Sequence, residues 1–227
     1  MRFPTSLALT LSVLAAANVL SHRVFPQADA LVSAAMVGGL AVIGRASRLS
    51  ADDLGLARRA VPAGLRWGGA AAAVTAVCYG VGALVPAIRD AVAPPSQSWS
   101  ASVVQALVVI PLLTVLPEEF AFRGVLWGLL NRRSGRRWAT AVSAAAFGLW
   151  HVLPALGTGA ANESAGSVLG SGPVGIAALV AGTVLFTGLG GVVLAELRAR
   201  SGSLVAPILL HWAVNGCGVI FVQLVGG

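Results

Sequence analysis

The sequence predicts an all-α fold, a polytopic transmembrane helical bundle of seven to eight spans. Composition supports the membrane assignment, because 57% of the 227 residues are hydrophobic and only 10% are charged. The mean hydropathy is +0.86, whereas about a quarter of the residues of a soluble domain carry charge. Ionisable side chains inside the apolar runs indicate a functional site, because such groups are costly in a bilayer and are usually retained for chemistry or for moving a charged species.

Apolar runs long enough to cross the bilayer define the elements, because a spanning helix needs about 20 residues and at least about 17. We expect spans at Pro4 to Leu20, Ala28 to Gly44, Leu65 to Ile88, Ala101 to Pro117, Trp138 to Leu156, Pro173 to Leu197 and Leu204 to Val225. The apolar stretch from Glu118 to Leu130 is too short to cross, so a tilted or re-entrant helix, or an eighth span lengthened by its neighbours, is expected there.

No internal domain boundary is visible, so residues 1–227 are expected to form a single integral membrane domain, with its motifs in 118–215. The Pro94–Pro95 turn and the Gly/Ser-rich stretch from Gly157 to Gly172 are expected to be linkers. The first apolar run also resembles a secretory signal. The several later spans favour a retained transmembrane helix instead.

Arginines are concentrated in alternate loops, which predicts the orientation. The loops that carry most of them are 45–66 and 132–137, whereas the opposite side receives only Arg23 and Arg89. Positive residues favour the cytoplasmic side, so we expect a multi-pass protein of the cell membrane with a cytoplasmic amino terminus. Topology therefore explains the net charge of +7, and no basic run interleaved with aromatics indicates nucleic acid as a partner. The partners we expect are the lipid bilayer and a protein or peptide substrate.

The first motif is the run from Glu118 to Arg123, EEFAFR. Glu119 and Arg123 are four residues apart, so on a helix they share a face and can form a charge pair. Glu118 points about 100° away and is left free in an apolar setting, where it can act as a general base. Read alone, the three groups could equally be a solvated patch at the end of a span.

Two further motifs carry imidazoles. Phe147 precedes His151 by one helical turn and can pack beneath its ring, and Asn215 follows His211 by the same step. Either histidine could be a satisfied core residue, and His211 with Asn215 could tie helices together instead of donating to an oxyanion. In one short chain, however, these groups supply two bases and an oxyanion-stabilising pair, which is what the hydrolysis of an amide needs.

The ordered set EExxxR, FxxxH and HxxxN resembles the CPBP (Abi) family of intramembrane proteases, which contains type II CAAX prenyl endopeptidases and bacteriocin-processing or immunity proteins. The resemblance implies a helical membrane fold around a catalytic cavity. It implies that Glu118 and His151 activate a water and that His211 and Asn215 stabilise the oxyanion. Glu119 and Arg123 are then assigned to support, as is Phe147.

Two alternatives remain. One Glu and two His could hold a catalytic zinc, although HExxH is absent and the resemblance implies metal-independent chemistry without a cofactor. A non-proteolytic factor, such as an immunity or binding protein or a small transporter, could use the same cluster, although no repeat symmetry indicates a transporter. Cys78 and Cys217 have no metal-ligand spacing. Neither the substrate nor its prenylation follows from the sequence.

Depth along the spans raises a difficulty for this site. His151 lies about 20 Å beyond Trp138 along a straight helix, whereas Glu118 is at the end of its predicted span. The groups can meet only if the Trp138 helix begins in the cytosol or the Ala101 helix continues past Glu118.

Overall fold

The computed structural model describes residues 1–161 and 172–226, and this part of the chain contains helices and no strand. The α-helices are α1 (Phe3–Val19), α2 (Asp29–Ala46), α3 (Ala51–Leu54), α4 (Val61–Leu84), α5 (Pro86–Asp90), α6 (Trp99–Val104), α7 (Leu116–Glu119), α8 (Trp127–Trp150), α9 (Val152–Ala161), α11 (Pro173–Ser201) and α12 (Val205–Val225). The wider π-helical segments are Leu20–Val24, Gln105–Val115 and Phe120–Leu126, and short 3-10 turns lie at Pro26–Ala28 and Arg58–Ala60.

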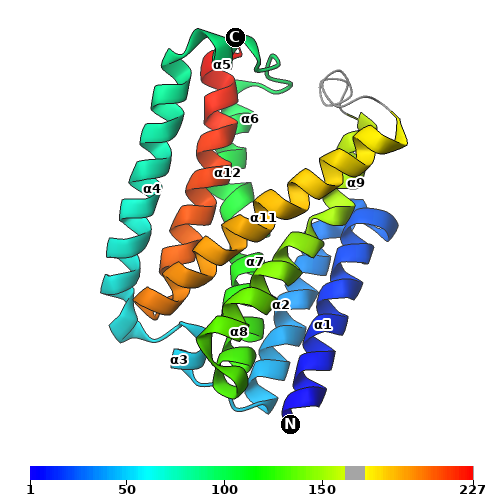
Figure 1. The fold of residues 1–227 in the computed structure, drawn as a ribbon, viewed down its shortest axis with the longest axis vertical. Helices are drawn as coiled ribbons and strands as arrows, with labels where there is room; N and C mark the ends of the chain where they lie inside the picture. The colour runs from blue at the N-terminus through cyan, green and yellow to red at the C-terminus, as the bar shows by residue number, and fades with distance from the viewer. Residues whose placement is uncertain (162–171, 227) are drawn as a thin grey trace.

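Six helical runs of the described residues are long and apolar enough to cross a membrane. The longest, Trp99–Gly157, has 59 residues and is two passes rather than one. Gly135 lies inside it with φ 79° and ψ 170°, a conformation that glycine tolerates and that reverses the chain. The six runs therefore make seven passes of helix, and the termini lie at opposite ends of the molecule (Figure 1).

The stretch from Glu118 to Leu130 is neither a re-entrant helix nor an eighth span. It lies inside one helix that runs from Trp99 through α7 into the first part of α8 and ends at the Gly135 turn. At 1.5 Å per residue this helix is over 50 Å long, well beyond the roughly 30 Å hydrocarbon core. The sequence left two ways for Glu118 and His151 to lie at the same depth in the membrane. The structure has the second one, in which the Ala101 helix continues past Glu118. The sequence suggested a shorter helix because Glu118 and Glu119 look like the end of an apolar run.

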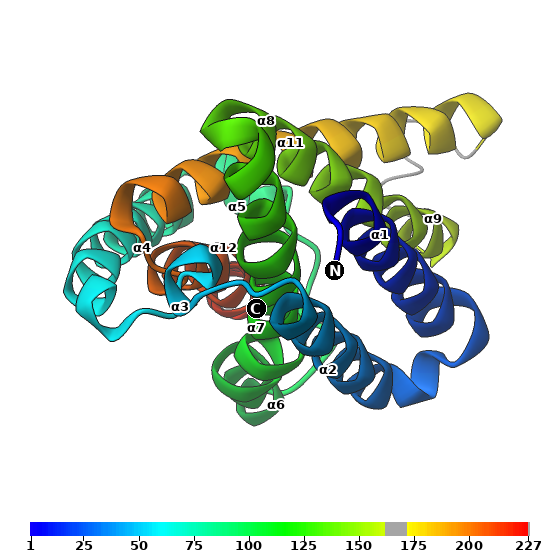
Figure 2. The ribbon, with the colours of Figure 1, turned by 90° about the horizontal axis from the view of Figure 1, so that it is seen from below.

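This long helix lies at the centre of the bundle. Figure 2 shows α7 between the α1–α2 pair on one side and the α4–α12 pair on the other. The second half of α8 packs along α11, which crosses the molecule obliquely (Figure 1). The first helix packs against α2 and α8, and Asn18 at its end donates Nδ2–H to the carbonyl of Trp150.

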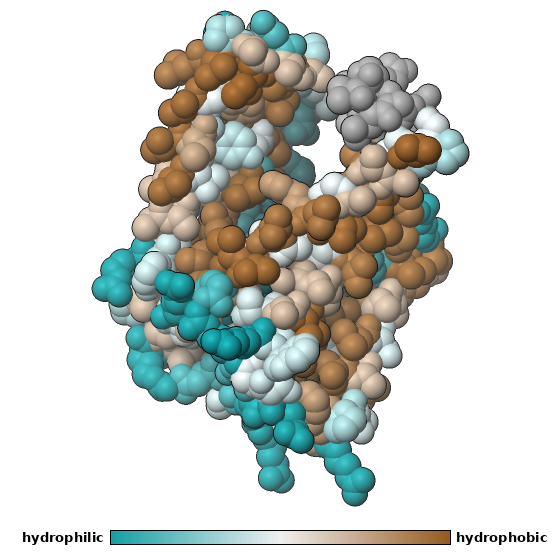
Figure 3. All heavy atoms as spheres, in the orientation of Figure 1, coloured by the Kyte–Doolittle hydropathy of each residue, from teal (hydrophilic) through white to brown (hydrophobic). Residues whose placement is uncertain are grey.

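Charged side chains gather at the end of the molecule that holds the amino terminus, and an apolar belt follows (Figure 3). Hydrogen bonds connect the Arg-rich loops there: Arg132 donates to the carbonyls of Ser47 and Arg48, and Arg198 to those of Asp52 and Asp53. These loops thus lie on one side, as the alternation of spans predicts. The predicted turn at Pro94–Pro95 is non-helical, whereas α9 continues to Ala161 into the predicted linker, whose residues 162–171 lie outside the described residues.

Helix α4 packs closely on α12 through Gly68. A Cβ added there would lie 2.8 Å from the Ala206 backbone, whereas one added at Gly69 would meet nothing within 4 Å. We expect Gly68→Ala to destabilise the protein by about 1–3 kcal/mol, because the two backbones must separate. Gly69→Ala is the matched control and should be neutral or slightly stabilising. Thermal unfolding in detergent measures both, and equal midpoints would contradict this account of the α4–α12 contact.

Candidate active site

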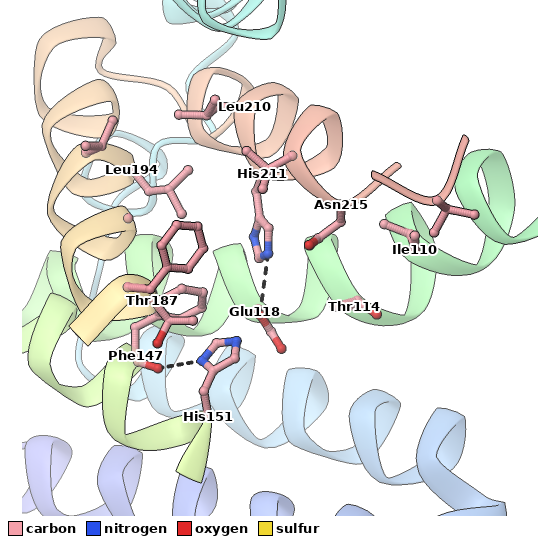
Figure 4. A pocket seen from close by; sticks show the side chains of 15 residues that line it. Ile110, Thr114, Glu118, Phe147, His151, Thr187, Leu194, Leu210, His211 and Asn215 are labelled. Atoms are coloured by element: carbon pink, nitrogen blue, oxygen red, sulfur yellow. Dashed lines mark hydrogen bonds and ion pairs between the residues drawn. The ribbon is translucent and has the colours of Figure 1, made fainter. Parts of the chain in front are cut away.

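A cavity of about 530 Å³ lies between the central helix, the end of α8, α11 and α12. Four of the residues predicted to be catalytic contribute to its wall: Glu118, His151, His211 and Asn215. Their side chains come from three different helices and point toward one another (Figure 4). Most of the remaining wall is aliphatic or aromatic, including Phe147 and Leu194.

Glu118 lies near the middle of the long helix, in the short α-helical segment α7 between two π-helical segments. Pro111 and Pro117 fall in the same region, and each lacks the N–H of a regular helical hydrogen bond. The widened turns absorb these interruptions without ending the helix, and such segments are frequent at functional sites. The carboxylate is only 9% exposed, and its Oε2 has no hydrogen-bond partner among the described residues.

His151 is oriented by the helix that ends just before it. Its Nδ1 lies 2.8 Å from the carbonyl oxygen of Phe147, and because a carbonyl only accepts, Nδ1 must carry the proton. Nε2 is therefore left with a lone pair when the ring is neutral. The Phe147 ring also packs edge-on against the imidazole, with centroids 4.7 Å apart. The one-turn spacing thus holds the histidine as the sequence predicts, through both the ring and the backbone of Phe147.

His211 lies between the two glutamates. Its Nδ1 is 2.8 Å from Glu119 Oε1, and its Nε2 is 3.8 Å from Glu118 Oε2. The two carboxylates are successive residues about 100° apart on the helix, yet one imidazole from α12 reaches both. The interpretation of Glu118 as wholly separate from the Glu119 pair is therefore incomplete, because His211 connects them.

Glu119 and Arg123 form the predicted ion pair, with Nη1 to Oε1 at 2.8 Å and both side chains fully buried. The guanidinium also lies 4.0 Å above the Phe147 ring and donates to the carbonyl of Gly191. A buried charge is tolerated only when paired and hydrogen-bonded. Arg123 Nη1, Arg123 Nη2 and Glu119 Oε1 meet that condition, whereas Arg123 Nε and Glu119 Oε2 have no hydrogen-bond partner among the described residues. The position of the ion pair next to His211 allows it to fix the orientation of that imidazole.

Asn215 follows His211 by one turn of α12 and lines the same cavity (Figure 4). Side chains four residues apart on a helix lie on one face, so the spacing alone places the amide beside the imidazole. The structure brings all seven predicted site residues into one region, with Glu118, Phe147, His151, His211 and Asn215 on the cavity wall and Glu119 and Arg123 behind it.

The sequence reasoning missed two contacts. Trp150 donates its indole N–H to Glu118 Oε1 at 3.0 Å, and the Gly191 carbonyl receives Arg123. A tryptophan beside His151 in an apolar run was a usable signal, because a buried indole usually finds an acceptor. No sequence signal marks a backbone carbonyl on a distant helix.

Within the described ranges, no three His, Cys, Asp or Glu side chains are grouped so that they could hold a metal ion. Cys78 and Cys217 are free thiols, and neither contributes to the cavity wall.

A family model described as "Type II CAAX prenyl endopeptidase Rce1-like" matches residues 98–217, more than half of the chain. The chain belongs to this family. The match confirms the resemblance predicted from the three motifs and includes every predicted site residue. No curated protein and no solved structure matches the chain.

At the level of the Rce1-like family, the chain is an intramembrane endopeptidase, and its apolar helices make it a multi-pass membrane protein. The matched range begins just before α6. Helices α1, α2 and α4 therefore lie outside the range that defines the family, although α1 and α2 pack against its central helix.

Proposed function

We propose that this Rce1-like chain is a metal-independent endopeptidase that hydrolyses a peptide bond with a water activated by Glu118 and His151. One observation carries the proposal: a single cavity inside the helical bundle is lined by a carboxylate oxygen that has no hydrogen-bond partner among the described residues, two imidazoles and an amide. The substrate is a protein or peptide whose scissile bond enters the cavity. The family description names prenylated CAAX proteins, and we propose this class as the first to be tested.

In the proposed reaction Glu118 accepts a proton from the water, and the water oxygen attacks the carbonyl carbon. The tetrahedral intermediate then collapses, the C–N bond breaks, and the proton passes to the leaving amine. His151 Nε2 can hold the same water or transfer that proton, because Nδ1 is committed to the Phe147 carbonyl. The donor from Trp150 holds Glu118 by Oε1, which leaves Oε2 for the water.

His211 and Asn215 are proposed to stabilise the oxyanion. Glu119 accepts from Nδ1 of His211, so Nε2 can donate only when the ring is an imidazolium. His211 Nε2 lies on the same side of the cavity as Asn215, and its ring is held by Glu119, which is itself bound to Arg123. Donors already fixed in a water-poor site contribute strongly to catalysis, since no reorganisation is needed when charge develops.

The test is direct cleavage by the purified chain in lipid vesicles. Paired CAAX peptides with and without a farnesyl group are supplied, and mass spectrometry locates the broken bond. Activity that persists after exhaustive chelation supports the metal-independent mechanism. Activity lost on chelation and restored by Zn²⁺ would favour the zinc alternative, with Glu118, His151 and His211 as ligands.

Asn215→Ala is expected to lower kcat by about 10²-fold, because loss of one oxyanion donor typically costs 10²–10³. Cys217→Ala, two residues further along α12 and absent from the cavity wall, is the matched control and should keep full activity. Initial rates at saturating peptide measure both. An Asn215→Ala variant with unchanged kcat would contradict the oxyanion role.

A further inference from the structure

A second cavity of about 230 Å³ lies beside the first, between α1, α2, the central helix and the α8–α9 junction. Three residues line both cavities: Thr114, Glu118 and His151. The proposed water-activating pair is therefore the partition between two compartments. Each compartment gives access to the same two side chains from a different side.

The smaller cavity differs from the larger one in its chemistry. The amino-terminal helices contribute Ser21, His22, Asp29 and Ser33 to its wall, in addition to Glu118 and His151. The larger cavity receives mainly aliphatic and aromatic side chains from α11 and α12. Buried water occupies cavities that are roomy and polar enough to give it hydrogen-bond partners, so the smaller cavity is the one built to be wet.

His22 is held in the same way as His151. Its Nδ1 lies 2.9 Å from the Asn18 carbonyl, which fixes the proton there and leaves Nε2 as a partner for a water. The His22 and Trp150 rings are in edge contact, and Asn18 donates to the Trp150 backbone. The amino-terminal helices thus contact Trp150, and Trp150 in turn donates a hydrogen bond to the carboxylate of Glu118.

We propose that the smaller cavity is a separate water-supply path, by which solvent reaches Glu118 and His151 while the substrate occupies the larger cavity. The proposal rests on the hydrolytic function above. Each turnover consumes one water: its oxygen joins the carbonyl carbon, and its two hydrogens end on the products, a carboxylate and an ammonium group. No net proton is taken up or released, so the path has to deliver water only.

The physical need for this path follows from the surroundings. A substrate that fills an apolar cavity displaces solvent from it, and lipid cannot replace the lost water. A polar compartment on the other side of Glu118 keeps a nucleophile available after the substrate has bound. His22 and Asp29 act as positioning residues that stabilise this water and do not touch the substrate.

Thiol labelling tests the hydration of the smaller cavity independently of activity. In a chain with Cys78→Ala and Cys217→Ala, Ser33→Cys places one thiol on the cavity wall. Ala35→Cys, two residues away and exposed on the opposite side of α2, is the matched control. We expect a charged methanethiosulfonate to modify Ser33→Cys at least tenfold faster in vesicles. Equal rates, or no reaction at Ser33→Cys, would overturn the proposal.

Kinetics then tests whether that water is the reactant. Ser33 lines the smaller cavity and not the larger one. Ser33→Leu narrows the smaller cavity, whereas Ser33→Ala does not. We expect Ser33→Leu to lower kcat at least tenfold with KM unchanged, and Ser33→Ala to retain most of the activity. Unchanged kcat in Ser33→Leu, with normal thermal unfolding, would refute the water path while the protease function stands. A parent chain without cleavage would refute the function itself, and labelling would still report the cavity.

Discussion

Replacing Glu118 by Gln is expected to abolish peptide-bond cleavage in a folded protein. The amide has nearly the same shape and can still accept from Trp150, but it cannot take a proton from water. Loss of a positioned base costs about 10²–10⁴ in kcat, and an upper value is expected because the second carboxylate, Glu119, is already bound to Arg123 and His211. Single-turnover cleavage of the vesicle-bound peptide measures the loss.

Glu196→Gln is the control for this experiment. Glu196 pairs with Arg136 and Arg200 outside the cavity, so its neutralisation should leave kcat unchanged. His151→Ala should lower kcat almost as far, and the Glu118→Gln/His151→Ala double variant should be little worse than either, because residues that activate one water act as a unit. Cleavage that survives both single substitutions would refute the protease proposal and favour a binding, immunity or transport role.

Arg123→Leu is expected to destabilise the protein by about 3–5 kcal/mol, the usual cost of removing one partner of a buried ion pair. Arg123 is fully buried, and its loss leaves the Glu119 carboxylate without its cation in a site closed to solvent. The cation–π contact with Phe147 and the bond to Gly191 disappear as well. Thermal unfolding in detergent measures the change.

The double variant Glu119→Gln/Arg123→Leu distinguishes two causes of the lost stability, the unpaired Glu119 charge and the lost packing of the Arg123 side chain. It should recover part of the stability, since no buried charge is left without a partner. Arg59→Leu is the surface control: its partner Asp52 is half-exposed, so the change should stay within about 1 kcal/mol. A double variant less stable than Arg123→Leu would show that Glu119 contributes chiefly through His211.

Local spacing explains how much of the site the sequence could predict. The pairs Glu119–Arg123, Phe147–His151 and His211–Asn215 are each four residues apart, and helical geometry alone places each pair on one face. The relation between the glutamates and His211 could not be predicted in this way, because His211 lies 92 positions after Glu119 in the chain and on a different helix. Packing of α12 against the central helix decides that distance.

The amino-terminal helices show most clearly what could not be predicted from the sequence. Their composition predicted two spans, and nothing in the sequence indicated a role for His22 or Asp29 at the junction between them. Only the packing of α1 and α2 against the central helix places these two residues in one cavity with Glu118 and His151.

The sequence by itself determined that the chain is a helical membrane protein, which family it resembles, and which side chains are the candidates for its chemistry. Hydropathy, arginine placement and one-turn spacings are local properties, and they survive any arrangement of the helices. The tertiary structure decided the length of the central helix, the position of one imidazole between two carboxylates, and the division of the interior into two cavities. These depend on how distant helices pack in three dimensions, which local spacing does not specify.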